Sequence, residues 1–132
     1  MSVRAHQASS AYRQIEAQTR SPIELVVMLY DGALRFIAQA RDAIERKDIP
    51  ARREALSRAL AIVNELQGTL NREQGGEIAE SLGDLYVYIN GRLVESAAKQ
   101  GVGPLDEASH LLAMLRSAWA EIAQQPVPGR QG

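Results

Sequence analysis

The stretch from Ser21 to Ile37 carries apolar side chains on two opposite sides of a predicted helix. A serine followed by Pro22 is a typical helix start. At 100° per residue, one face holds Ile23, Val26, Val27, Tyr30, Leu34 and Ile37, and the other holds Leu25, Met28, Leu29, Gly32, Phe36 and Ala40. A helix with two apolar faces has to bury both. One face is therefore predicted to pack on the protein's own core, and the other against a second layer of the chain or a partner.

Composition limits what else the chain can be. Its 132 residues are enough for one domain with one core. The net charge is -1 and acids and bases are interspersed, which argues against binding to nucleic acid or an anionic membrane. The absence of cysteine excludes disulfides and fits a cytosolic protein. No stretch is apolar enough for membrane insertion, and residues 1–10 lack the apolar core of a secretory signal.

The apolar periodicity predicts four long helices, over residues 22–47, 50–72, 77–99 and 104–124. Pro50, Gly75–Gly76 and the Gly101–Pro104 segment separate them. Short connections favour antiparallel neighbours, so the expected fold is an all-α, antiparallel up-down four-helix bundle. Residues 1–20 are expected to form an N-terminal arm with a short cap helix near residues 8–18. Residues 21–124 are expected to form the bundle, and residues 125–132 a flexible tail.

The later helices each show one clear apolar stripe, predicted to face the core. The members are Leu56, Ala59, Leu60, Val63, Leu66 and Leu70 on the second helix; Ile78, Leu82, Leu85, Tyr86, Ile89 and Leu93 on the third; and Leu105, Ala108, Leu112, Leu115, Trp119 and Ile122 on the fourth. Ile62 lies at the edge of its stripe. Val87 and Val94 form a thinner strip on another side of the third helix.

No group of residues predicts catalysis or a cofactor. Glu107 and His110 have the Glu-x-x-His spacing of di-iron bundles, but that site needs a second such motif, and the only other histidine is His6. A histidine phosphotransfer bundle is an alternative function, yet His110 lacks the following Lys-Gly pair. Glu77, Glu80 and Asp84 are explained by the positive end of a helix dipole. The chain is therefore predicted not to be an enzyme.

The second apolar face of helix 22–47 has two interpretations. It packs under the N-terminal arm or in a purely structural helical dimer, or it forms a groove for a partner's amphipathic helix. The two are compatible if the arm covers the groove until a partner displaces it. Light scattering would detect a dimer, and an acid-labile phosphate on His110 would favour signalling.

Several motifs together resemble the FliS family of flagellar secretion chaperones. Ser21–Pro22, Leu25 and the run Met28-Leu29-Tyr30-Asp31-Gly32 are similar to the family's opening helix. The runs 61–66 and 70–79, then Leu85-Tyr86-Val87-Tyr88-Ile89 and the segment from Leu115 to Trp119, follow in the same order. The resemblance covers about residues 12–122.

This resemblance implies a cytosolic, non-enzymatic chaperone that binds the C-terminal segment of flagellin, prevents its premature polymerisation and delivers it to the flagellar type III export apparatus. It also implies that Tyr12 caps the groove and contacts the export gate. An anti-sigma regulator or a co-chaperone as a further partner is left open. Together with the helical faces, the expected flagellin-binding residues are Tyr12, Ile15, Leu25, Met28, Leu29, Phe36, Ile62, Leu66, Val87 and Val94.

Overall fold

The computed structural model describes residues 21–70, 72–99 and 101–124, with the side chains of residues 72–74 left out. In this part of the chain the fold is all-α, with helices α2 (Pro22–Arg46), α3 (Ile49–Gly68), α4 (Arg72–Lys99) and α5 (Val102–Gln124). The expected cap helix, Tyr12 and Ile15, and the expected tail lie outside the described residues.

Short connections and capped ends set the up-down order. Ser21 and Glu24 form a capping box at the start of α2, in which the Ser21 hydroxyl accepts from Glu24 N at 3.1 Å. Lys47 ends α2 in a left-handed conformation, and Asp48 caps α3 by accepting from Ala51 N at 3.1 Å. The chain therefore reverses direction within two residues.

The second helix ends earlier than expected, at Gly68 and not near residue 72. Glycine is a poor helix former, and the Thr69 hydroxyl donates to Leu66 O at 2.6 Å, which competes with continuation of the helix. The third helix begins earlier, at Arg72, but its backbone breaks at Gly76, next to the expected start at residue 77.

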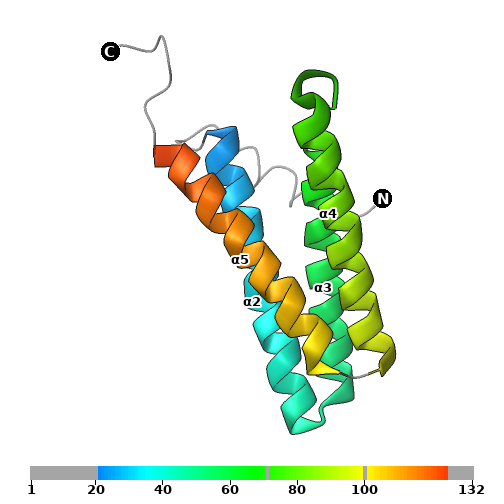
Figure 1. The fold of residues 1–132 in the computed structure, drawn as a ribbon. Coiled ribbons are helices and arrows are strands. Elements are labelled where there is room, and N and C mark those ends of the chain that lie inside the picture. The colour runs from blue at the N-terminus through cyan, green and yellow to red at the C-terminus, as the bar shows by residue number, and fades with distance from the viewer. Residues whose placement is uncertain (1–20, 71, 100, 125–132) are drawn as a thin grey trace, which may run out of the picture.

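The four helices form a closed ring of neighbours, α2 next to α3 and α5, and α4 also next to α3 and α5. Figure 1 shows two pairs, α2 with α5 and α3 with α4, that lie close at the end carrying the α2–α3 turn and diverge toward the opposite end. The antiparallel up-down bundle is confirmed.

The core runs along the axis of the bundle. Its fully buried members include Tyr30, Ile37, Val63, Leu66, Tyr86, Ile89, Leu93, Leu105 and Leu112. On α2 the prediction was partly wrong. Tyr30 and Ile37 are core residues, but Ala33 and Ala40 complete the buried stripe, while Ile23, Val26 and Val27 are only partly buried. Small alanines at these positions let neighbouring helices pack closely, whereas the periodicity favoured the larger side chains.

Candidate functional site

An apolar cleft of about 340 Å³ opens at the end of the bundle where the two helix pairs diverge. All four helices or their ends contribute to it: Val26 from α2, Thr69 and Leu70 after α3, Gly75, Ile78, Ala79, Leu82 and Tyr86 from α4, and Trp119 from α5. The lining is mostly apolar, and Ile78 is 74% exposed. A concave apolar surface of this kind suits the apolar face of an amphipathic segment.

Two glycines shape the α4 side of this cleft. Gly76 has φ 54 and ψ -128, a backbone conformation that side chains strongly disfavour. A Cβ added to Gly75 would lie 2.7 Å from Ala79 Cβ, so only glycine permits this close approach. Gly75 therefore packs closely against Ala79 and forms part of the cleft wall.

Tyr86 links the cleft to the core. Its hydroxyl lies 2.5 Å from the hydroxyl of Tyr30, and the two tilted rings are 6.5 Å apart. Both residues are almost fully buried, and burial raises the pKa of both hydroxyls above the ordinary value of 10.0. The pair is therefore neutral at physiological pH and provides a polar connection between the diagonally opposed helices α2 and α4.

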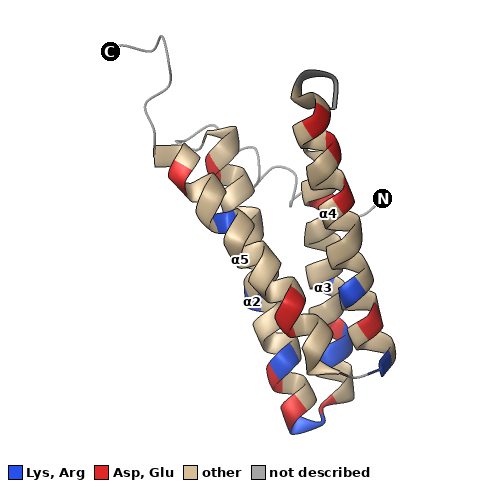
Figure 2. Cartoon of the chain, in the orientation of Figure 1, with Lys and Arg blue, Asp and Glu red and all other residues tan. Residues whose placement is uncertain are grey.

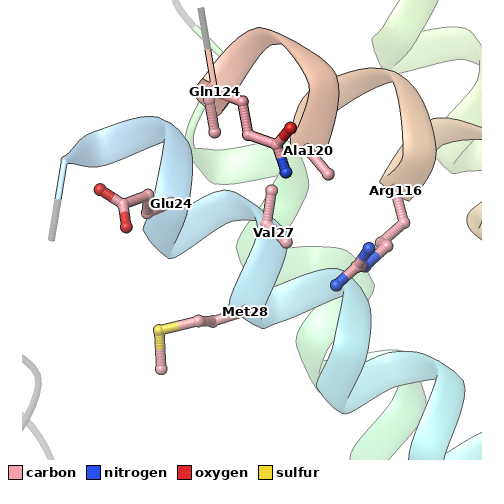
Figure 3. Close-up of a pocket in the computed structure, with 7 residues that line it drawn as sticks. Glu24, Val27, Met28, Arg116, Ala120 and Gln124 are labelled. Atoms are coloured by element: carbon pink, nitrogen blue, oxygen red, sulfur yellow. The ribbon is translucent and has the colours of Figure 1, made fainter.

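A second groove, of about 370 Å³, lies between α2 and α5 at the same end of the bundle (Figure 3). Val27 and Met28 line it from α2, and Ala120 and Ala123 from α5. Met28 is 43% exposed. These four side chains give the groove an apolar part.

Polar side chains also line this groove. They are Glu24, Arg116 and Gln124. Arg116 Nε lies 2.8 Å from Asp31 Oδ1, and this hydrogen-bonded ion pair raises the pKa of the Arg116 guanidinium. The pair joins α5 to α2 and fixes one end of the groove.

The exposed side of α4 near the cleft is acidic. Glu77, Glu80 and Asp84 are all exposed, and Figure 2 shows the acidic residues spaced along this part of the helix. Ile78, Ser81, Leu82 and Leu85 lie among them and line a shallow hollow with Glu77. The mouth of the cleft is therefore apolar with an acidic border, which favours a partner segment that carries basic residues.

The predicted binding residues on α2 fall into different environments. Met28 is exposed in the second groove, as the docking hypothesis requires. Leu25 is 4% exposed, although it does not belong to the central core cluster. Leu29 and Phe36 are partly buried and pack against that cluster. The side chains of Arg35 and Arg58 lie over the Phe36 ring, at 5.3 and 5.7 Å from its centre.

The predicted binding residues on α3 and α4 divide in the same way. Leu66 is fully buried in the core, and Ile62 is partly buried against it. Val87 and Val94 are 58% and 54% exposed on one face of α4, but they do not line the cleft. In this conformation the structure therefore places Met28, Val87 and Val94 at the surface, on different sides of the bundle.

The cleft residues were all assigned to the core from sequence, or to no site. Leu70, Ile78, Leu82, Tyr86 and Trp119 continue the core stripes of their helices, which is why periodicity did not distinguish them. One feature of the sequence could have indicated the open cleft. Gly68, a poor helix former, ends α3 although the apolar stripe continues to Leu70, so the start of the α4 stripe at Ile78 has less of α3 to cover it.

The structure also shows the surroundings of the Glu107–His110 motif. The Glu107 carboxylate accepts from Tyr88 Oη at 2.8 Å and lies 2.6 Å from Arg92 Nε, and His110 is exposed. No group of three metal-ligating side chains occurs among the described residues. Within the same part of the chain, no helix is long and apolar enough to span a membrane.

A four-helix bundle with an apolar cleft at its open end is typical of an all-α binding protein. The family model described as "Flagellar protein FliS" matches residues 5–126, and the chain belongs to this family. It is a family of chaperones, not of enzymes.

Curated relatives cover nearly the whole chain. The flagellar secretion chaperone FliS of Bacillus subtilis is 38% identical over 93% of this chain and 91% of its own length. FliSB of Pseudomonas aeruginosa, also a flagellar secretion chaperone, is 39% identical over 90% and 98%. FliS of Salmonella typhimurium is 36% identical over 86% and 87%.

Proposed function

We propose that this protein is a cytosolic export chaperone that binds the C-terminal helical segment of flagellin, prevents its premature polymerisation and delivers it to the flagellar type III secretion apparatus. The observation that carries the proposal is the apolar cleft at the diverging end of the bundle, together with membership in a family whose curated members are flagellar secretion chaperones. An apolar cleft without a catalytic group suits a protein that hides another chain's apolar surface.

The cleft and the groove lie on two sides of the first turns of α2. Val26 lines the cleft, and the next two residues, Val27 and Met28, line the groove. A single flagellin segment that passes around α2 would bury both surfaces. Leu29, Phe36, Ile62, Val87 and Val94 remain proposed contacts along such a path. Leu25 and Leu66 would contact flagellin only if neighbouring elements move aside, because both are buried here.

We propose that the N-terminal arm, through Tyr12 and Ile15, covers the cleft before flagellin arrives and is then displaced toward the export gate. Residues 1–20 contain three arginines and one glutamate. This basic charge complements the acidic border formed by Glu77, Glu80 and Asp84, and the arm joins α2 at Ser21, about one turn from Val26.

The mechanism follows from coupled folding and binding. A free flagellin tail that is disordered and amphipathic exposes the surface through which flagellins assemble. On the chaperone the tail becomes ordered, and its apolar face is buried. Part of the binding free energy is used to order the tail, which keeps the complex reversible, and release at the export apparatus then needs no nucleotide.

The direct test is calorimetric titration of the full chain with flagellin and with flagellin that lacks its last roughly 40 residues, a length able to bury a standard interface. We expect binding of the complete protein and loss of binding on truncation. Equal binding of the two, or no binding of either, would contradict the proposal.

A further inference from the structure

The Tyr30–Tyr86 pair leaves one hydroxyl hydrogen without an acceptor. Two phenol groups carry two hydrogens, and one link between their oxygens uses one of them. Among the described residues, no other side-chain or backbone acceptor is hydrogen-bonded to either hydroxyl. A buried donor without a partner costs free energy, so the second hydrogen needs an acceptor from elsewhere.

Position decides which tyrosine an outside group can reach. Both tyrosines are almost fully buried, but Tyr86 lines the bottom of the cleft and Tyr30 does not. The acid–base behaviour of the pair agrees with this. Burial raises the pKa of both hydroxyls, and the hydrogen bond from Tyr30 offsets part of the rise in the pKa of Tyr86. Either hydroxyl can donate within the pair, so an acceptor that enters the cleft and takes the Tyr86 hydrogen leaves Tyr30 as the donor to Tyr86.

We propose that the Tyr86 hydroxyl is a specificity determinant of the cleft, and that it donates a hydrogen bond to a neutral acceptor side chain of the flagellin segment. This inference rests on the proposed function. It predicts that a segment with only apolar side chains at this depth binds less well than one carrying Ser, Thr, Asn or Gln there.

The chemistry of the acceptor follows from the surroundings. If the bound segment is a helix, its interior carbonyls are already paired within the helix, so the acceptor is a side chain. The remaining lining near Tyr86 is apolar, including Val26, Leu82 and Trp119. A carboxylate would lose its hydration there and would also meet the acidic border of α4, which disfavours Asp and Glu.

The test compares Tyr86→Phe with Tyr88→Phe in the full chain, by calorimetric titration with a peptide of the flagellin C-terminal segment. Tyr88 is the matched control, because it lies on the same helix, is exposed and bonds Glu107 away from the cleft. Loss of one neutral hydrogen bond is expected to weaken binding of Tyr86→Phe roughly three- to tenfold, with no change for Tyr88→Phe.

A scan of the peptide identifies the acceptor. Each Ser, Thr, Asn and Gln is replaced by Ala in turn. One replacement should weaken binding to the wild-type chain and have no further effect on Tyr86→Phe, because both changes remove the same hydrogen bond. Additive effects at every position would overturn the proposal.

A third measurement keeps the proposal testable if Tyr86→Phe folds poorly. In the wild-type chain with carbon-13 at the tyrosine Cζ positions, the Tyr86 signal should shift on peptide binding, and less so with the acceptor-free peptide. An unchanged Tyr86 signal, or equal affinities for wild type and Tyr86→Phe, would overturn this inference while leaving the proposed function intact. Absence of peptide binding to wild type would overturn both.

Discussion

Gly32 of α2 faces the end of the Ile62 side chain of α3 at close range. A Cβ added to Gly32 would lie 3.1 Å from Ile62 Cδ1, which is tighter than ordinary van der Waals contact. The missing side chain lets the two helices approach closely, with Ile62 packed into the contact. This explains why Ile62, predicted from sequence as a docking residue, is partly buried.

Enlarging Gly32 should separate the two helices. We expect Gly32→Leu to lower the free energy of unfolding by about 1–3 kcal/mol, because the new side chain overpacks against Ile62. Gly91 is the control, since nothing lies within 4 Å of a Cβ added there. Gly91→Ala should raise stability by about 0.5–1 kcal/mol. Urea unfolding measures both, and equal effects of the two changes would refute the close-approach account.

The capping box at the start of α2 supports the helix on which both apolar surfaces depend. Ser21→Ala removes the acceptor for Glu24 N and should cost about 1 kcal/mol. Ser57→Ala, at an exposed position inside α3, should change stability by less than about 0.5 kcal/mol. Thermal unfolding followed by circular dichroism compares the two variants. An unchanged stability of Ser21→Ala would contradict a stabilising role of the capping box.

The buried tyrosines predict a loss of stability at alkaline pH. Above pH 10, tyrosines of the unfolded chain release their protons, while Tyr30 and Tyr86 keep theirs because their folded pKa is raised. The unfolded state then binds fewer protons than the folded state, so stability falls as pH rises, by about 1.4 kcal/mol per pH unit for each tyrosine. Tyr30→Phe should flatten this dependence in urea titrations between pH 10 and 11.5. An unchanged slope would argue against a buried neutral pair.

The exposed apolar residue at the cleft mouth should matter for binding and not for folding. Ile78→Asp places a charge in the contact and adds to the acidic border, so we expect it to weaken flagellin binding at least tenfold. Ile49→Asp, also exposed but at the opposite end of the bundle, should bind as wild type does. Both variants should show wild-type unfolding curves. Equal affinity for both would place the binding surface elsewhere.

Much of the fold was predictable because its signals are local. Ser21–Pro22, Asp48 with Pro50, and Gly75–Gly76 mark where helices begin or break, and each does so in the structure. The end of α3 was wrong by about a turn, because Gly68 and the Thr69 hydroxyl bond stop the helix while the apolar pattern continues to Leu70.

The binding surface was harder to predict, because it depends on how far each helix extends past its neighbours. Leu29 and Leu66 have the same apolar character as Met28, yet they pack on or in the core, while Met28 is exposed. Tyr86 and Ile78 belong to the same apolar stripe of α4. Tyr86 is buried in the core, whereas Ile78 is exposed at the open end of the bundle. Apolar periodicity predicts which face of a helix is buried, but not how far the neighbouring helix extends to cover that face.

The most direct measurement of the central claim is site-specific photocrosslinking with full-length flagellin. A benzophenone amino acid replaces Ile78 at the cleft mouth in one variant and Ile49 at the opposite end in another. The account predicts a crosslink from position 78 to the C-terminal segment of flagellin, and none from position 49. Crosslinks from position 49 alone, or from position 78 only to other parts of flagellin, would contradict it.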